Sequence, residues 1–81
     1  MWATSLSVGQ RVICSCEDKR LGKAIYHKTG TIIFDARPEG KDALLVQFEE
    51  FIGGHDGGRP DIKGKDGFCC WVEPRCLHIL S

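Results

Sequence analysis

The sequence predicts an all-β fold, a single domain of about five short antiparallel strands. Four observations support this prediction. The chain has only 81 residues, its apolar runs are short, and a turn-forming or charged stretch separates each run from the next. The runs recur at intervals of about ten residues, which is typical of small barrels and sandwiches. Residues 1–81 therefore form one domain with a thin core.

The first two expected strands lie in the N-terminal half. QRVICSC, residues 10–16, places Val12, Cys14 and Cys16 on one face and more polar neighbours on the other. A charged turn, EDKRLGK, follows. TGTIIFDA, residues 29–36, is rich in β-branched side chains, which pack well in strands. Both segments therefore predict strands with one buried face.

The third expected strand follows the segment RPEGKD. This segment predicts a turn, because Pro38 has a fixed φ and Gly40 tolerates a positive φ. ALLVQFEEF, residues 43–51, has its even-numbered apolar residues on one face and Leu45 on the other. A helix is the weaker alternative for this segment, because its neighbours are β-branched and aromatic.

The last two expected strands are GFCCWV, residues 67–72, and CLHIL, residues 76–80, joined by the tight turn EPR. No internal repeat or linker divides the chain. A closed barrel would also remove the exposed strand edges through which small sheets aggregate. The sequence thus favours a small barrel with a single long loop.

The charge balance and the hydropathy of the sequence argue against two classes of function. Eleven basic residues balance eleven acidic ones, which argues against a duplex-DNA binder because such proteins need a basic face. No stretch reaches the roughly 20 apolar residues of a membrane span. The start, MWATSLSVGQ, lacks the features of a secretory signal. We therefore expect a cytoplasmic protein with no membrane association.

The five cysteines predict packed thiols. Their odd number and the absence of a signal sequence favour a reducing compartment and no disulfide framework. The alternative is a zinc site, with no other cofactor expected, formed by Cys14, Cys16, Cys76 and His78. This set is the minority hypothesis, because C-x-C on a straight strand separates the two Cα atoms by about 6.5 to 7 Å.

The glycine loop, residues 53–67, is the first candidate binding element. Six of the ten glycines lie in its sequence, GGHDGGRPDIKGKDG, and we expect it to add little to the core. Glycine-rich backbone can turn N–H groups toward an anion. The candidate ligand-binding residues in the loop are His55, Asp56, Arg59, Lys63 and Lys65. A solvated loop in which Asp56 only shapes a turn is the structural alternative.

Trp71 follows the glycine loop closely and is the second candidate. An exposed aromatic ring at this position can stack on a base, a proline or a side chain of a partner, while a core role is the alternative. Tyr26 is expected to face it across a groove. Nothing in the sequence supplies the spacing of a nucleophile and its base. We therefore expect no enzymatic activity.

The segments VGQRVIC, KTGTIIF, ALLVQFEE and CCWVEPRCLHIL resemble, in this order, the strands of SH3-like barrels. In that family a W-V-x-P-x-x-L segment passes through a short 3₁₀ turn into the last strand. The combination of GHDG, residues 54–57, with Cys70 and Trp71 is similar to small SH3-like proteins of phages and bacteria. The resemblance covers residues 8–80. A single tryptophan stands here where relatives often have two aromatic residues.

This resemblance implies a small SH3-like barrel but does not choose a ligand, because such barrels bind many kinds of partner. It also implies a phage-encoded protein that acts in the host cytoplasm. The expected partner is a host protein or a small anionic, nucleotide-like ligand, bound through residues 53–67 and the Trp71 surface. Oligomerisation, expected as a homo-oligomer, would bring neighbouring loops together.

Overall fold

The structure is a computed structural model and describes residues 6–80. It contains five strands: β1 (Arg11–Cys14), β2 (Thr29–Asp35), β3 (Leu44–Phe48), β4 (Cys69–Val72) and β5 (Leu77–Ile79). Three short 3₁₀ helices connect them: η1 (Lys23–Ile25), η2 (Arg37–Glu39) and η3 (Pro74–Cys76). The described residues contain no α-helix. The predicted all-β class is therefore confirmed, although each strand is shorter than its expected segment.

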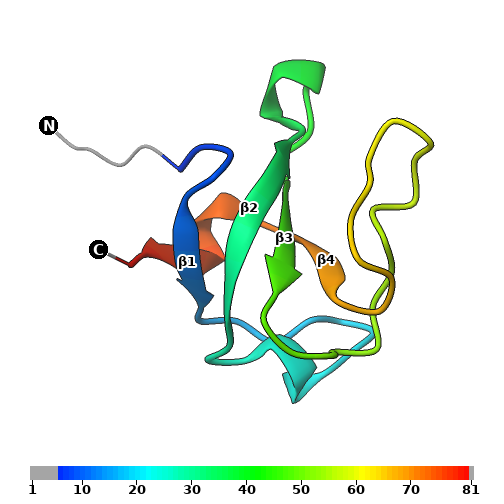
Figure 1. The fold of residues 1–81 in the computed structure, drawn as a ribbon. Helices are drawn as coiled ribbons and strands as arrows, with labels where there is room; N and C mark the ends of the chain where they lie inside the picture. Colours follow the sequence, from blue (N-terminus) through cyan, green and yellow to red (C-terminus); the bar gives the residue numbers. More distant parts are fainter. Residues whose placement is uncertain (1–5, 81) are drawn as a thin grey trace, which may run out of the picture.

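The five strands form one antiparallel sheet in the order β4-β3-β2-β1-β5 (Figure 1). A bulge between Ile32 and Phe34 bends β2 and increases its twist. The turn η2 ends at Gly40 with φ 85°, as its sequence predicts. Pairing between β4 and β5 is not found in the described part of the chain, and η3 joins these two strands. No helix among these residues is long and apolar enough to span a membrane.

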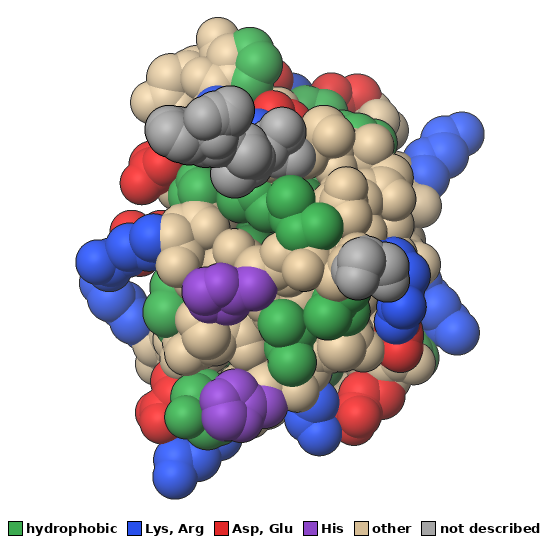
Figure 2. Space-filling model, turned by 90° about the vertical axis from the view of Figure 1, so that its left-hand side faces the viewer, with side chains coloured by type: hydrophobic (Ala, Val, Ile, Leu, Met, Phe, Trp, Pro, Cys, Tyr) green, Lys and Arg blue, Asp and Glu red, His purple; other side chains and the backbone are tan. Residues whose placement is uncertain are grey.

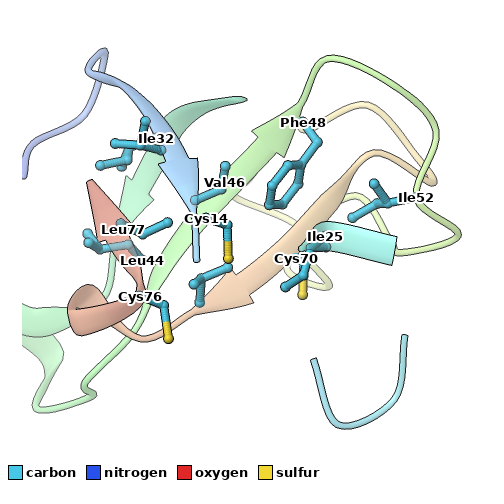
Figure 3. Packing of buried hydrophobic residues seen from close by; sticks show 12 residues of the cluster. Cys14, Ile25, Ile32, Leu44, Val46, Phe48, Ile52, Cys70, Cys76 and Leu77 are labelled. Carbon is cyan, nitrogen blue, oxygen red and sulfur yellow. The ribbon is translucent and has the colours of Figure 1, made fainter. Parts of the chain in front are cut away.

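The main core lies on one face of the sheet, where side chains from all five strands pack together (Figure 3). The even-numbered residues of β3 point into it, as predicted, and meet residues from every other strand. Its buried members are Val12, Cys14, Ile25, Ile32, Leu44, Val46, Phe48, Ile52, Cys70, Val72, Cys76 and Leu77. Because the apolar contacts come from segments far apart in the sequence, this core fixes the sheet rather than any single hairpin.

A second, smaller cluster lies on the other face of the sheet. Leu45, Ile62 and Cys69 are buried there, and Phe34 and Trp71 pack against them. Ile62 belongs to the glycine loop and is only 8% exposed. The expectation that this loop adds almost nothing to the core is therefore wrong, because the loop covers an apolar sheet face that would otherwise meet water.

Close approach explains why glycine recurs in this loop. A Cβ atom at Gly57 would lie 2.5 Å from Cγ2 of Ile62, and one at Gly54 would collide with the carbonyl oxygen of Cys69. Gly57 also has φ 112°, a conformation that only glycine adopts without strain. The glycines thus let the loop lie flat against β4, to which His55 is joined by an isolated bridge with Cys69.

A disulfide joins Cys16 to Cys76, 60 residues apart in the sequence. This pairing corrects the expectation that the cysteines are packed thiols without a disulfide. The other three, Cys14, Cys69 and Cys70, are free and buried. Burial raises the pKa of the Cys14 and Cys69 thiols, so both favour the neutral form. The disulfide ties the segment after β1 to η3.

Candidate ligand-binding site

Trp71 is the centre of the site. Its half-buried ring packs edge-on against Phe34, with the ring centroids 6.0 Å apart and the planes at 87°. Trp71 also lines three pockets of about 160, 440 and 420 Å³. Arg20 lines the same three pockets. Trp71 and Arg20 therefore border all three hollows.

The arginine loop, residues 15–22, presents Arg20. Its turn is closed by backbone hydrogen bonds of 2.9 and 2.8 Å between Asp18 and Gly22. The carboxylate of Asp18 also accepts hydrogen bonds from the backbone N–H groups of Arg20, at 2.8 Å, and Leu21, at 2.9 Å. This is the local turn chemistry that aspartate favours. Asp18 therefore organises the loop that presents Arg20.

Asp18 also connects the arginine loop to β4. Its Oδ1 atom accepts a hydrogen bond from the Cys70 thiol at 3.4 Å. Burial, together with the Asp18 charge, raises the pKa of Cys70 to about 12. Burial acts against the Asp18 carboxylate, but the N–H groups of Leu21 and Arg20 and the thiol lower its pKa overall. The pair is thus a carboxylate and a neutral, poorly nucleophilic thiol.

Arg20 differs from the other arginines in its ion pairing. Each of the other four has a carboxylate partner: Arg11 with Glu49, Arg37 with Asp35, Arg59 with Glu39 and Asp61, and Arg75 with Glu73. Arg20 is exposed and forms no ion pair with any residue between 6 and 80. Its guanidinium is therefore available to an external anion.

The 440 Å³ pocket, called here the basic pocket, lies between Arg20 and the glycine loop. Its charged and polar lining consists of Arg20, Lys41, His55 and Arg59, next to Trp71, and alanines and glycines complete it. No aspartate or glutamate is among these lining residues. Lys41, like Arg20, has no ion pair in the described chain. The pocket therefore combines an aromatic wall with an excess of positive charge.

His55 is fixed by the backbone of its own loop. Its Nδ1 atom accepts a hydrogen bond of 2.9 Å from the N–H of Gly57, so the neutral ring carries its proton on Nε2. His55 lines both the basic pocket and the 160 Å³ pocket. It can therefore donate one hydrogen bond to a ligand without carrying a charge.

Arg59 lies at the basic pocket, but its charge is engaged. Its guanidinium binds Glu39 at 2.7 Å and Asp61 at 3.0 Å and lies 4.9 Å from the centre of the Phe34 ring. Hydrogen bonds to Glu39 and Asp61 raise the pKa of Arg59. Arg59 therefore joins the glycine loop to η2, and its positive charge is already paired.

The backbone of the glycine loop is also largely engaged. The N–H of Gly57 is bound to His55, and that of Gly58 to the Asp56 carboxylate at 3.1 Å. Asp56 thus has the turn-forming role considered from the sequence. The N–H groups of Gly57 and Gly58 are therefore not free to bind an anion, contrary to the prediction for the glycine loop. The positive groups that are available to an anion are those of Arg20 and Lys41.

Three other predicted residues lie away from these pockets. Lys63 is exposed, and Lys65 places its ammonium 4.2 Å from the centre of the Phe68 ring. Tyr26 stacks on His27, with the ring centroids 3.9 Å apart. None of Lys63, Lys65 and Tyr26 lines the three pockets that Trp71 lines. The structure thus brings the predicted residues His55, Arg59 and Trp71 to one pocket, together with the arginine loop, which was not among the predicted site residues.

The alternative zinc set is not assembled. Cys16 and Cys76 are joined in the disulfide, the Cys14 thiol donates to the carbonyl of Cys16, and His78 pairs with the Ser15 hydroxyl at 2.9 Å. No group of three or more His, Cys, Asp and Glu residues within residues 6–80 is arranged to hold a metal ion.

Comparison with protein-family models, curated proteins and solved structures finds no match to this chain. The chemistry of the site therefore rests on its own residues, which place around one pocket a tryptophan ring, an imidazole and two cations without an ion pair in the described part of the chain.

Proposed function

We propose that this protein is a non-catalytic binding module whose ligand carries a planar ring and an anionic group. The observation that carries the proposal is the basic pocket, which is lined by Trp71, by Arg20 with no ion pair among residues 6–80, and by no acidic residue. The ring of the ligand stacks on Trp71, the anion pairs with Arg20 and Lys41, and His55 donates a hydrogen bond. A small nucleotide-like ligand has these features.

The dimensions and energies agree with such a ligand. A pocket of about 440 Å³ falls within the usual range for small-molecule sites, roughly 300 to 1,000 Å³. Stacking of a base on an aromatic side chain contributes about 1–3 kcal/mol. A guanidinium binds phosphate oxygens through paired hydrogen bonds. These two contributions favour a ligand that carries both a planar ring and an anionic group.

A host protein is the second candidate, and one observation favours it. Trp71 and Arg20 line three pockets rather than one, and tryptophan and arginine are enriched among the residues that dominate protein interfaces. The 420 Å³ pocket is lined by acidic and basic residues alike, including Glu17, Glu73 and Arg75. Such a surface suits a protein partner of a phage-encoded module as well as a small ligand.

Isothermal titration calorimetry with adenosine monophosphate, and separately with inorganic phosphate and adenosine, tests the proposal. We expect the nucleotide to bind more tightly than either part. Arg20→Gln should weaken nucleotide binding about tenfold, the loss of one charge-assisted interaction. Arg11→Gln is the matched control, because Arg11, on β1, is paired with Glu49 and lines none of the three pockets. It should leave the affinity unchanged.

Trp71→Phe separates the two candidates. It keeps a ring that can pack on Phe34 but reduces the stacking surface, so nucleotide binding should weaken while thermal unfolding changes little. Failure of any nucleotide to bind the wild-type protein would reject the small-ligand proposal. A complex with a host protein that is lost in both Arg20→Gln and Trp71→Phe would then support the second candidate.

A further inference from the structure

Strand β5 has one side of its backbone without a partner among residues 6–80. It pairs with β1 through His78, opposite Ile13, and through the N–H of Leu80. In an antiparallel pair, hydrogen-bonded residues alternate with residues whose backbone groups point away from the neighbouring strand. The N–H and C=O of Ile79 and the C=O of Leu77 therefore point away from β1, toward the outer edge of the sheet.

These three backbone groups have no hydrogen-bond partner among the described residues. The N–H of Leu77, by contrast, donates to the carbonyl of Pro74. Sheets usually cover, twist or shorten an edge of this kind, because unpaired backbone groups accept another extended chain. The edge of β5 is therefore competent for strand addition, in which main-chain hydrogen bonds provide the affinity.

A groove of about 550 Å³ runs along this edge. It is lined by Leu77, His78 and Ile79 together with Pro74 of η3. Side chains of successive strand residues point to opposite faces, so a hollow that touches all three β5 residues follows the edge rather than one face. Ile79 is 44% exposed. Figure 2 shows hydrophobic side chains gathered on the face that carries β1 and β5.

The charged lining of this edge groove is basic. Arg37 and Arg75 line it, and none of its lining residues is acidic. Each of these arginines binds one carboxylate outside the lining, Asp35 and Glu73, through its Nε and Nη2 atoms. A guanidinium has five N–H donors, so Arg37 and Arg75 can each share a second carboxylate through Nη1, unlike Arg59, which already binds two. A chain entering the groove therefore meets guanidinium groups and an exposed isoleucine, which complement glutamate or aspartate alternating with apolar residues.

We propose that the outer edge of β5 binds an extended acidic segment of a partner protein, which adds to the sheet as a further antiparallel or parallel strand. Apolar side chains of the segment pack on Ile79, and its acidic side chains approach Arg37 and Arg75. The site is separate from the basic pocket and does not depend on the function proposed for it. A second copy of this chain is the weaker occupant, because twofold pairing would bring Arg75 of both copies to one interface.

Fluorescence anisotropy with a labelled peptide tests this proposal in the full chain. The peptide alternates valine and glutamate over about six residues, the usual strand length, and the control peptide has lysine in place of glutamate. We expect the acidic peptide to bind and the basic peptide to fail. Ile79→Pro removes the outward N–H without touching a bond to β1, so it should weaken binding about tenfold. Ile79→Ala keeps the N–H and should weaken binding less.

Peptides with N-methyl groups at alternate positions provide a second measurement that leaves the protein unchanged. Methyl groups on the N–H groups that face β5 should abolish binding, whereas methyl groups on the opposite set should have little effect. Equal binding by both methylated peptides, or no binding by the acidic peptide, overturns the proposal. So does sedimentation showing a wild-type dimer that Ile79→Pro dissociates, since a second copy would then occupy the edge.

Discussion

The arginine loop and the glycine loop meet at Trp71 but are held in different ways. Residues 15–22 are fixed at their start by the Cys16–Cys76 disulfide and in their middle by the contact of Asp18 with Cys70. Residues 53–67 are held by one buried side chain, Ile62, and by glycines that allow close approach, together with the His55–Cys69 bridge and the Arg59–Glu39 ion pair. The arginine loop thus presents Arg20 from a segment that is held by a covalent bond and by an electrostatic contact. The glycine loop forms a wall of the basic pocket and is held mainly by packing.

Removal of the disulfide should have the largest effect and should act first on the arginine loop. In the chain-entropy treatment, a cross-link between residues 60 apart stabilises by about 4 kcal/mol. We expect the Cys16→Ser/Cys76→Ser protein to unfold at much lower urea concentration and to bind a nucleotide more weakly than wild type. Reducing agent should destabilise the wild-type protein by a similar amount.

The double serine variant is its own control for the reducing agent, which should not destabilise it further. Equal urea midpoints for the oxidised protein and the variant would contradict the assignment of the disulfide as the main support of the arginine loop.

Ile62→Ala tests the packing that holds the glycine loop. Loss of a buried isoleucine side chain typically costs about 2–5 kcal/mol. We expect a value near the lower end, because the second cluster is small and Ile62 is 8% exposed. Lys63→Ala is the matched control one residue away, on an exposed side chain. Chemical denaturation measures both. Equal stability of the two variants would mean that the loop is not anchored by packing.

Sequence patterns predicted the sheet well because their physical cause is local. Alternation of apolar residues in residues 43–51 predicted the buried faces of β3, and the order Pro38 then Gly40 predicted the turn at η2. The strand ends were overestimated, since residues such as Cys16 continue the alternation but belong to the arginine loop. The alternation of apolar residues alone does not indicate where hydrogen-bonded strand pairing ends.

The site was predicted only in part because its supports join distant residues. Asp18 and Cys70 are 52 residues apart, and nothing in the segment EDKRLGK marks Arg20 as different from its charged neighbours. The pairing of Arg59 with Glu39 likewise connects two separate turns. An apolar residue inside the polar glycine loop, Ile62, was the one local signal that this loop packs on the sheet.

Asp18→Asn should have a moderate effect on the arginine loop. The change weakens two charge-assisted bonds to backbone N–H groups and the contact with the Cys70 thiol, together about 1–2 kcal/mol. Because folding lowers the Asp18 pKa, its stabilisation is present above the ordinary carboxyl pKa, about 3.9, and is lost as pH falls through the lower folded value. Urea unfolding at several pH values should therefore show that the variant loses less stability than the wild-type protein as the pH falls.

Neutralising Arg59 should have the smallest effect on stability, because its ion pairs are exposed and such pairs contribute little. Its effect on binding should nevertheless be measurable. Arg59→Gln leaves Glu39 and Asp61 without their cation near the basic pocket, so the affinity for an anionic ligand should fall even if Arg59 never contacts that ligand. Glu39→Gln removes one of the two carboxylates and should raise the affinity. Calorimetry at low and high salt distinguishes the two modes of action. Opposite changes in affinity that both become smaller at high salt would show that Arg59 acts through the electrostatic field of its ion pairs. A salt-independent loss of affinity in Arg59→Gln alone would show direct contact with the ligand.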